Sequence, residues 1–286
     1  MTRNILFIFS LVYSIFFVGF SQNIPEGNWR GIIKASNQTI DDSDVFYISF
    51  KDESKGFSRI EKLNTKEYVY KEFSISTKND KIILEERYIK ASSNSKNAPK
   101  CKLNYEMSYD ESSGYLTGTY KSSDCKNVMG EITLYRTNQP INSDKEPTLT
   151  HYWKYQFAIS LSKGLPSPEI LERERKNFEF SPIYFDHDKS EIKPEFYEYL
   201  NKLARILEGL HDLRLLVVGH TDAVGTDEYN IGLSERRAKA IKDYFLKQGI
   251  ENEKLEIDFK GKRMPIDTNK TPEGKSRNRR VDFSFI

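Results

Sequence analysis

Three patterns of hydrophobic and polar residues divide the chain. Residues 5–20 are almost wholly apolar. Between residues 24 and 136, short stretches rich in aromatic and β-branched residues alternate with polar turns, which predicts β-strands. Beyond residue 177, short apolar strands alternate with segments whose hydrophobic positions follow the three-and-four spacing of helices. These patterns predict a leader followed by an α+β protein of two folded domains.

The β-rich part, residues 22–138, is expected to form a small antiparallel sandwich or barrel. Its predicted strands cover residues 45–50, 68–75, 81–88, 103–109, 115–120 and 130–135. The opening Gly27-Asn28-Trp29-Arg30-Gly31 resembles the Gly-x-Trp-x-Gly start of lipocalin-like barrels, in which a tryptophan closes one end. These five residues are also compatible with a plain structural Trp29 in a first strand.

Residues 139–176 have the composition of a linker, with four prolines among polar residues. We expect two short helices there, at about residues 151–161 and 168–176. The C-terminal domain, residues 177–286, reads as β-α-β-α-β-β, so its helices should cover one face of a mixed sheet. Its second helix is predicted from about Glu228 to Gln248, with Gly249 at its C-cap.

Composition and charge exclude some classes of partner. The 44 Lys and Arg against 42 Asp and Glu leave a formal net charge of +2, which provides no overall attraction for nucleic acid. Residues 262–280 are locally basic, but the C-terminal domain from Asn177 onward carries 19 basic and 20 acidic residues, so this segment does not indicate nucleic-acid binding. The 17 Tyr and 18 Phe can fill β-rich cores although only 37% of the residues are hydrophobic.

The N-terminus has the features of a secretory signal peptide at residues 1–21. Arg3 precedes the apolar run, and small residues at Gly19 and Ser21 fit a cut after Ser21. The alternative is a retained membrane anchor, but the run is shorter than the roughly 20 residues of a spanning helix. In an exported chain Cys101 and Cys125 predict a disulfide rather than a metal site, because zinc normally takes four ligands; two free thiols are the alternative.

Two polar segments of the C-terminal domain are candidates for ligand binding. Thr221 and Asp222 follow a buried apolar strand, and Arg237 lies about two turns into the next helix. An aspartate and an arginine that converge on one pocket can bind a zwitterion. A simple salt bridge between Asp222 and Arg237 explains the pair equally well. His220 has neither a second histidine nor a nucleophile nearby, so no enzyme activity, metal or cofactor is expected.

Four ordered blocks make residues 180–286 resemble the OmpA-like C-terminal domain, which also occurs in peptidoglycan-associated lipoproteins and flagellar stator subunits. The blocks are residues 184–192, residues 219–222 with Gly225, residues 230–238, and a closing set of Gly261, Pro265, Glu273-Gly274 and residues 278–281.

The resemblance implies non-covalent binding of peptidoglycan through the diaminopimelate of its stem peptide. Asp222 would pair with the ammonium of that side chain and Arg237 with its carboxylate. The pocket would be completed by Thr221, Asn230, Leu233 and Arg279, with Asp186 and Asp188 contributing mainly through their backbone. We therefore expect a periplasmic protein associated with peptidoglycan and the outer membrane. In the alternative, the β-rich domain carries a small lipophilic ligand or binds an envelope protein, and the C-terminal domain is only an anchor.

Overall fold

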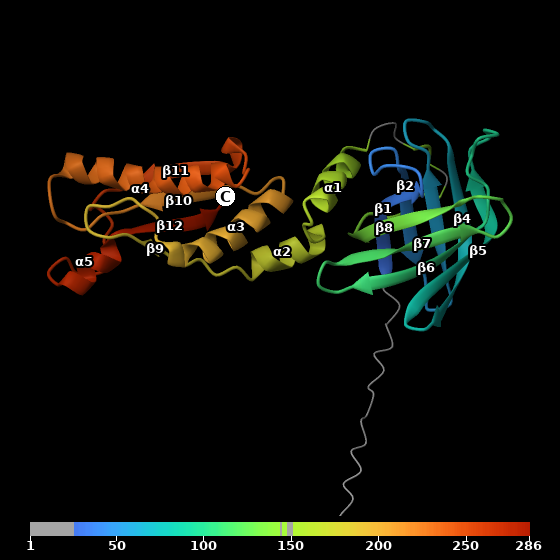
Figure 1. Ribbon diagram of the computed structural model, residues 1–286, viewed down its shortest axis with the longest axis horizontal. Helices are drawn as coiled ribbons and strands as arrows, with labels where there is room; N and C mark the ends of the chain where they lie inside the picture. Colours follow the sequence, from blue (N-terminus) through green and yellow to red (C-terminus); the bar gives the residue numbers. More distant parts are fainter. Residues whose placement is uncertain (1–25, 144, 148–150) are drawn as a thin grey trace, which may run out of the picture.

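The computed structural model of the protein describes residues 26–143, 145–147 and 151–286. The signal peptide expected at residues 1–21 lies outside the described residues. Within them, an eight-stranded β-barrel and an α/β domain are joined by two helices (Figure 1). No helix of these three ranges is long and apolar enough to cross a membrane.

The N-terminal part is a closed antiparallel barrel in which each strand pairs with the next and the last pairs with the first. Its strands are β1 (Gly27–Ala35), β2 (Asp44–Phe50), β3 (Lys55–Glu61), β4 (Tyr68–Lys78), β5 (Lys81–Ser92), β6 (Leu103–Asp110), β7 (Tyr115–Ser122) and β8 (Met129–Thr137). Of the two predicted forms, the structure has the barrel. The strand β3 was absent from the prediction, because its buried Ser58, Arg59 and Glu61 interrupt the apolar alternation that marks a strand.

Side chains fill the centre of the barrel. The largest that are fully buried in its core include Trp29, Phe46, Phe73, Tyr105 and Met107. Trp29 meets the edge of the Tyr109 ring at 5.5 Å, and the Arg136 guanidinium lies 5.0 Å from the centre of the Trp29 ring. A lipophilic ligand in the centre, as one form of the alternative function requires, would have to displace this packed core.

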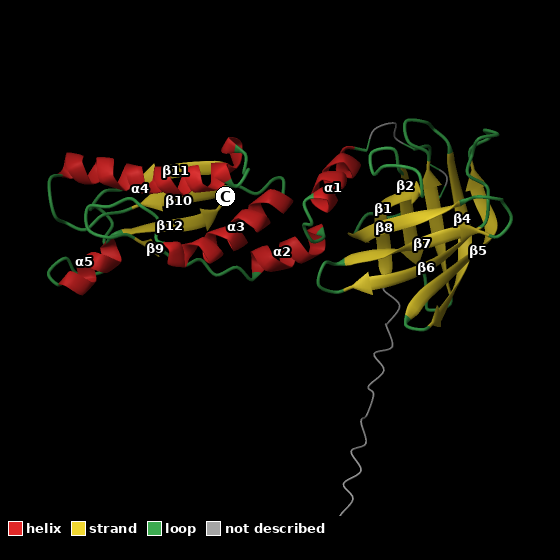
Figure 2. Cartoon of the chain, viewed as in Figure 1, coloured by secondary structure: helices red, strands yellow, loops and turns green. Residues whose placement is uncertain are grey.

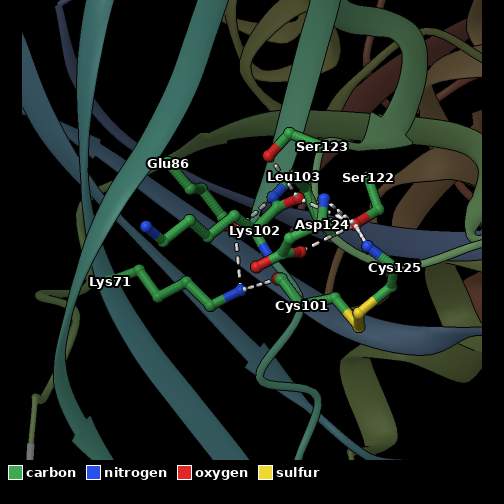
Figure 3. The surroundings of a disulfide bond; sticks show 9 residues. All are labelled: Lys71, Glu86, Cys101, Lys102, Leu103, Ser122, Ser123, Asp124 and Cys125. Carbon is green, nitrogen blue, oxygen red and sulfur yellow. Dashed lines mark hydrogen bonds and ion pairs between the residues drawn. A yellow bond between two sulfur atoms is a disulfide. The ribbon is translucent and has the colours of Figure 1, made fainter.

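The predicted disulfide between Cys101 and Cys125 is present, with Cα atoms 5.8 Å apart, and it joins the β5–β6 loop to the β7–β8 loop (Figure 3). Beside it, the Lys71 ammonium lies 2.6 Å from the Glu86 carboxylate and donates to the carbonyl oxygen of Cys101. Glu86 also accepts hydrogen bonds from Ser58 Oγ, Tyr105 OH and the backbone N–H of Leu103. This ion pair is buried, so it is stable only because each charge has several partners.

Residues 139–176 contain α1 (Tyr152–Ser162) and α2 (Pro168–Lys176), close to the predicted helices. Both helices lie between the barrel and the C-terminal domain (Figure 2). Helix α1 lies on the barrel wall, where the Arg30 guanidinium is 4.9 Å from the Trp153 ring and 5.1 Å from the Tyr135 ring. The backbone N–H at the N-cap of α2, Ser167, donates to the Ser113 carbonyl in the β6–β7 turn. On its other side, Leu171 of α2 packs in a cluster with residues that follow in the next domain.

The C-terminal domain is a four-stranded mixed sheet with helices packed against it. Its elements are β9 (Ile183–Tyr184), a 3₁₀ turn η1 (Pro194–Phe196), α3 (Tyr197–Gly209), β10 (Leu215–Gly219), α4 (Asp227–Lys247), η2 (Asn252–Lys254), β11 (Leu255–Phe259), α5 (Pro272–Asn278) and β12 (Arg280–Phe285). The strand order is β11-β10-β12-β9, and only the pair β10 and β11 is parallel.

One core joins these helices to the sheet, with Leu203 of α3 and Ile241 of α4 packed on Val217 of β10. The mixed sheet and both long helices agree with the prediction. Helix α5 was not predicted, because its seven residues carry almost no apolar side chain. It is defined by its cap, in which Thr271 Oγ1 accepts the backbone N–H of Gly274.

Candidate functional site

A pocket of about 110 Å³ opens at the C-terminal end of β10. It contains seven of the eight residues predicted for the site, namely Asp188, Thr221, Asp222, Asn230, Leu233, Arg237 and Arg279. His187, Val224, Gly225 and Tyr229 complete the lining. The eighth predicted residue, Asp186, does not line the pocket, because its carboxylate pairs with Lys193 at 2.9 Å.

Local sequence explains why these residues meet. The strand β10 ends at Gly219, where a Cβ atom would lie 2.0 Å from the carbonyl oxygen of Ser234, so glycine lets α4 approach the strand closely. The helix α4 starts soon afterwards, because Thr226 Oγ1 accepts the backbone N–H of Tyr229 as an N-cap. Asn230, Leu233 and Arg237 then follow at helical spacing and face the loop after β10.

Arg237 is fully buried and is held by backbone carbonyl groups. Its Nε donates to Lys189 O at 2.8 Å, Nη1 to His220 O at 2.8 Å and Nη2 to Asp186 O at 3.1 Å. These bonds use three of the five guanidinium N–H groups. Burial, together with the nearby charge of Arg279, lowers the pKa of Arg237 to about 10, so the side chain stays charged at neutral pH.

The partner of Asp222 within the structure is Arg279, so the simple salt bridge between Asp222 and Arg237 is not formed. Arg279 Nη1 lies 3.0 Å from Asp222 Oδ2, and Asp222 Oδ1 accepts the backbone N–H of Val224 at 3.0 Å. The exposed ring of His187 places Nδ1 3.8 Å from the same Oδ2. Asp222 is 3% exposed, which makes its carboxylate a buried anion at the base of the pocket.

The other predicted residues shape the walls. Asn230 Nδ2 donates to the carbonyl groups of Val224 and Thr226 at 2.9 Å each, which fixes the loop before α4. Thr221 Oγ1 donates to the Asp222 carbonyl at 2.9 Å. Asp186 contributes its carbonyl oxygen to Arg237, which is the backbone role that the resemblance implied.

Tyr229 is a lining residue that sequence reasoning missed. Its hydroxyl donates to Asp188 Oδ1 across the mouth of the pocket. The sequence signal was its place immediately before the matched block that starts at Asn230. His220 does not line the pocket, since its buried ring places Nε2 3.2 Å from Asp282 Oδ2 instead.

Opposite charges balance in this pocket. Asp188 and Asp222 contribute two negative charges, and Arg237 and Arg279 contribute two positive charges. A site of this kind can receive a ligand end that carries an ammonium and a carboxylate side by side, because each group finds an opposite charge.

A larger cavity, about 320 Å³, lies between the barrel wall and residues 139–142, 145–147 and 151–153. Its buried charges are engaged with each other and with the covering segment. Arg59 Nε lies 2.5 Å from Glu61, and the Arg59 guanidinium donates to the carbonyl groups of Asn142, Ser143 and Lys145. Glu61 also lies 3.3 Å from His151 Nε2. These contacts hold the covering segment to the wall.

The fold and the pocket define an OmpA-like domain, and residues 184–279 match the model of the OmpA family. The chain is 42% identical over 103 residues to outer membrane protein A of Bordetella avium, which covers 36% of this chain and 53% of that protein. It is 41% identical over 101 residues to the peptidoglycan-associated lipoprotein of Pseudomonas aeruginosa, covering 35% of this chain and 60% of the relative.

A solved structure of the peptidoglycan-associated lipoprotein from Burkholderia pseudomallei is similar over 37% of this chain and 89% of that chain, with 28% identity and a TM-score of 0.36. The match thus spans only about half to three fifths of the length of these two curated relatives. These relatives are envelope proteins rather than enzymes.

Proposed function

We propose that the protein binds peptidoglycan non-covalently through the diaminopimelate side chain of the stem peptide. The observation that supports this most directly is the charge-balanced pocket, which is built from the blocks matched to the OmpA family. The far end of diaminopimelate carries both an amine and a carboxylate. Relatives named as peptidoglycan-associated lipoprotein and peptidoglycan-binding protein support peptidoglycan as the polymer.

In this proposal each charge of the pocket has a defined partner on the ligand. Asp222 receives the ammonium, since its oxygens keep lone pairs beyond those used by Arg279 and Val224. The ligand carboxylate binds those guanidinium N–H groups of Arg237 and Arg279 that make no hydrogen bond within the protein. Thr221, Asn230 and Leu233 form the walls. One small zwitterion offers few contacts, so single-site affinity is modest and many sites on the polymer supply avidity.

Retention on purified cell-wall sacculi tests the site. Asp222→Asn is the sharpest variant, because the amide keeps the size of the side chain while it removes the charge and replaces one of the two acceptor oxygens by a donor. We expect its retention to fall by about tenfold or more, the loss of one charge-assisted contact. The matched control is Asp243→Asn on the exposed side of α4. Equal retention of both variants and the unmodified protein would refute the proposed site.

The chemical identity of the ligand has its own test. Stem peptides with diaminopimelate in the third position should compete for sacculus binding, whereas otherwise identical peptides with lysine there should not. The lysine side chain keeps the ammonium but lacks the second carboxylate that the arginines need. Equal competition by both peptides would show that binding does not require the second carboxylate of diaminopimelate.

We infer further that the protein acts in the periplasm as a tether between the cell wall and the outer-membrane side of the envelope. The alternative assigns the main function to the barrel, with the C-terminal domain as its anchor. The packed core of the barrel favours a partner on the barrel surface over a carried lipophilic ligand. Native mass spectrometry of the exported protein distinguishes them, because a carrier would retain a lipid-sized mass.

A further inference from the structure

Five exposed lysines gather at one end of the barrel, on the two loops that the disulfide joins. We call them the lysine patch: Lys96, Lys100, Lys102, Lys121 and Lys126. Asp124 is the only acidic residue of residues 93–102 and 121–128. No ion pair connects any of the five ammonium groups to a carboxylate of the described residues. Outside these ranges, the Glu67 carboxylate accepts a hydrogen bond from Ser95 beside Lys96, so the patch carries three unbalanced positive charges, although the whole chain is close to neutral.

The disulfide and two hydrogen bonds hold the backbone in place near three of these lysines. The disulfide connects neighbours of Lys100, Lys102 and Lys126, and Figure 3 shows how closely the two loops meet there. The Lys102 carbonyl accepts the backbone N–H of Ser123 at 3.0 Å, and its own N–H donates to Asp124 Oδ1 at 2.8 Å. Asp124 is thus committed to the backbone. Repulsion among fixed like charges opposes folding, whereas an anionic surface nearby would relieve it.

The lysine patch lies at the end of the barrel that points away from the peptidoglycan pocket. The other end of β6 and β7, the turn at residues 111–114, contacts α2 through the hydrogen bond between Ser113 and Ser167. Figure 1 shows this turn beside α2, with the opposite ends of both strands on the far side of the barrel. The pocket is at the outer end of the other domain. The two features thus occupy opposite ends of the molecule.

We propose that the lysine patch docks on the surface of a bilayer containing anionic phospholipids. All five cations are lysines, whose ammonium is a compact point charge without the fork that arginine uses for paired recognition of one defined group. A delocalised field of lipid phosphates matches such charges. Met129 is 47% exposed and pairs in register with Lys121, which adds an apolar contact at the headgroup level.

Vesicle co-sedimentation of the exported full-length chain tests this docking. The probes are neutral phosphatidylcholine vesicles and vesicles with about one third phosphatidylglycerol. Each lysine near such a surface contributes about fivefold in affinity. The triple variant K100E/K102E/K126E should therefore bind anionic vesicles at least about tenfold more weakly. The matched control K51E/K55E/K78E makes the same charge change at the other end of the barrel and should bind like the unmodified chain.

Three outcomes would overturn the proposal: equal binding to neutral and anionic vesicles, equal losses in both triple variants, or no loss in either. High salt should release the unmodified chain from anionic vesicles, since exposed charges are screened. If the patch variant instead loses retention on sacculi while its vesicle binding is unchanged, the patch serves the cell-wall polymer. The vesicles contain no peptidoglycan, so this test is independent of the proposed wall binding.

Discussion

At the scale of single residues, the two groups first singled out as a pair have different functions. Arg237 joins the loop of Asp186 and Lys189 to the strand end at His220, so it builds the walls of the pocket. Asp222 is paired with Arg279, and its charged carboxylate lies at the base of the pocket. A loss of binding after a change at Arg237 therefore combines a lost contact with a lost structure, whereas a change at Asp222 reports mainly on the ligand.

This difference predicts separate effects on stability. Arg237→Ala removes three hydrogen bonds to backbone carbonyl groups, each worth about 1 kcal/mol, so the free energy of unfolding should fall by about 3 kcal/mol. Asp222→Asn keeps one acceptor oxygen where Val224 and Arg279 use two, so it loses one hydrogen bond and should cost about 1.5 kcal/mol. Urea unfolding measures both. Similar losses in the two variants would contradict the structural function of Arg237.

Glu61 predicts a dependence of barrel stability on pH. Burial alone raises the pKa of Glu61, but hydrogen bonds from His151 and Arg59 outweigh it and hold the pKa below its ordinary value. The folded protein then binds this proton more weakly than the unfolded chain. Its contribution to stability is complete above the ordinary carboxyl pKa and is lost as the pH falls below that value and through the lower folded pKa.

Denaturation midpoints measured across this pH range check the effect. Glu61→Gln should flatten the acid loss of stability, because the amide does not titrate. The control Glu53→Gln, on an exposed turn, should leave the profile of the unmodified protein unchanged. Parallel profiles for the two variants would show that Glu61 does not carry the acid dependence.

At the scale of elements, the site depends on the close contact between β10 and α4. The backbone of Gly219 leaves no room for a side chain beside Ser234. Ser234 also accepts the backbone N–H of Gly261 through its hydroxyl, so strand, helix and the loop after β11 meet at one point. The register of these three elements decides where Asp222 stands relative to α4.

Gly219→Ala should therefore both destabilise the domain and weaken sacculus binding. The added methyl group has to push α4 away from β10, a distortion that costs about 1–3 kcal/mol. Gly232→Ala is the matched control, since the nearest atom to its Cβ is the flexible end of Arg236 at 3.4 Å. Alanine in this helix position should stabilise by up to about 1 kcal/mol. The prediction would be contradicted if Gly232→Ala lowered stability and sacculus retention more than Gly219→Ala.

At the scale of the whole molecule, the helices α1 and α2 connect the two domains by packing as well as by sequence. Arg136 of the barrel lies 3.3 Å from Glu169 of α2, and Lys163 lies 2.5 Å from Glu208 of α3. Leu171 packs with Ile206 and Leu210. The segment that composition marks as a linker therefore acts as a spacer that places the lysine patch and the pocket at the end of β10 at opposite ends of the molecule.

Leu171→Ala tests this spacer. Leu171 is 1% exposed, and removing its buried methyl groups should cost about 2–4 kcal/mol at the contact between α2 and α3. Calorimetry should then separate the unfolding of the barrel from that of the C-terminal domain. The control Leu246→Ala, at a side chain 38% exposed, should keep the original profile. An unchanged profile for Leu171→Ala would mean that the domains unfold independently of this contact.

The sequence by itself determined the elements whose signals are local. Alternating aromatic and β-branched residues predicted most of the barrel strands, and the spacing of apolar residues predicted α3 and α4. Ordered motifs brought seven of the eight site residues together in advance. These signals can be recognised in the sequence because the residues that form a strand face, a helix face or a family motif lie close together along the chain.

Only the tertiary structure decided the contacts that join distant positions. The pairing of Asp222 with Arg279 rather than Arg237, the strand β3 with its buried charges, and the closing of the barrel by β1 and β8 are such contacts. The lysine patch belongs to the same class, because the disulfide brings together two loops that the sequence separates. Long-range contacts depend on how all elements pack at once, so no local pattern specifies them.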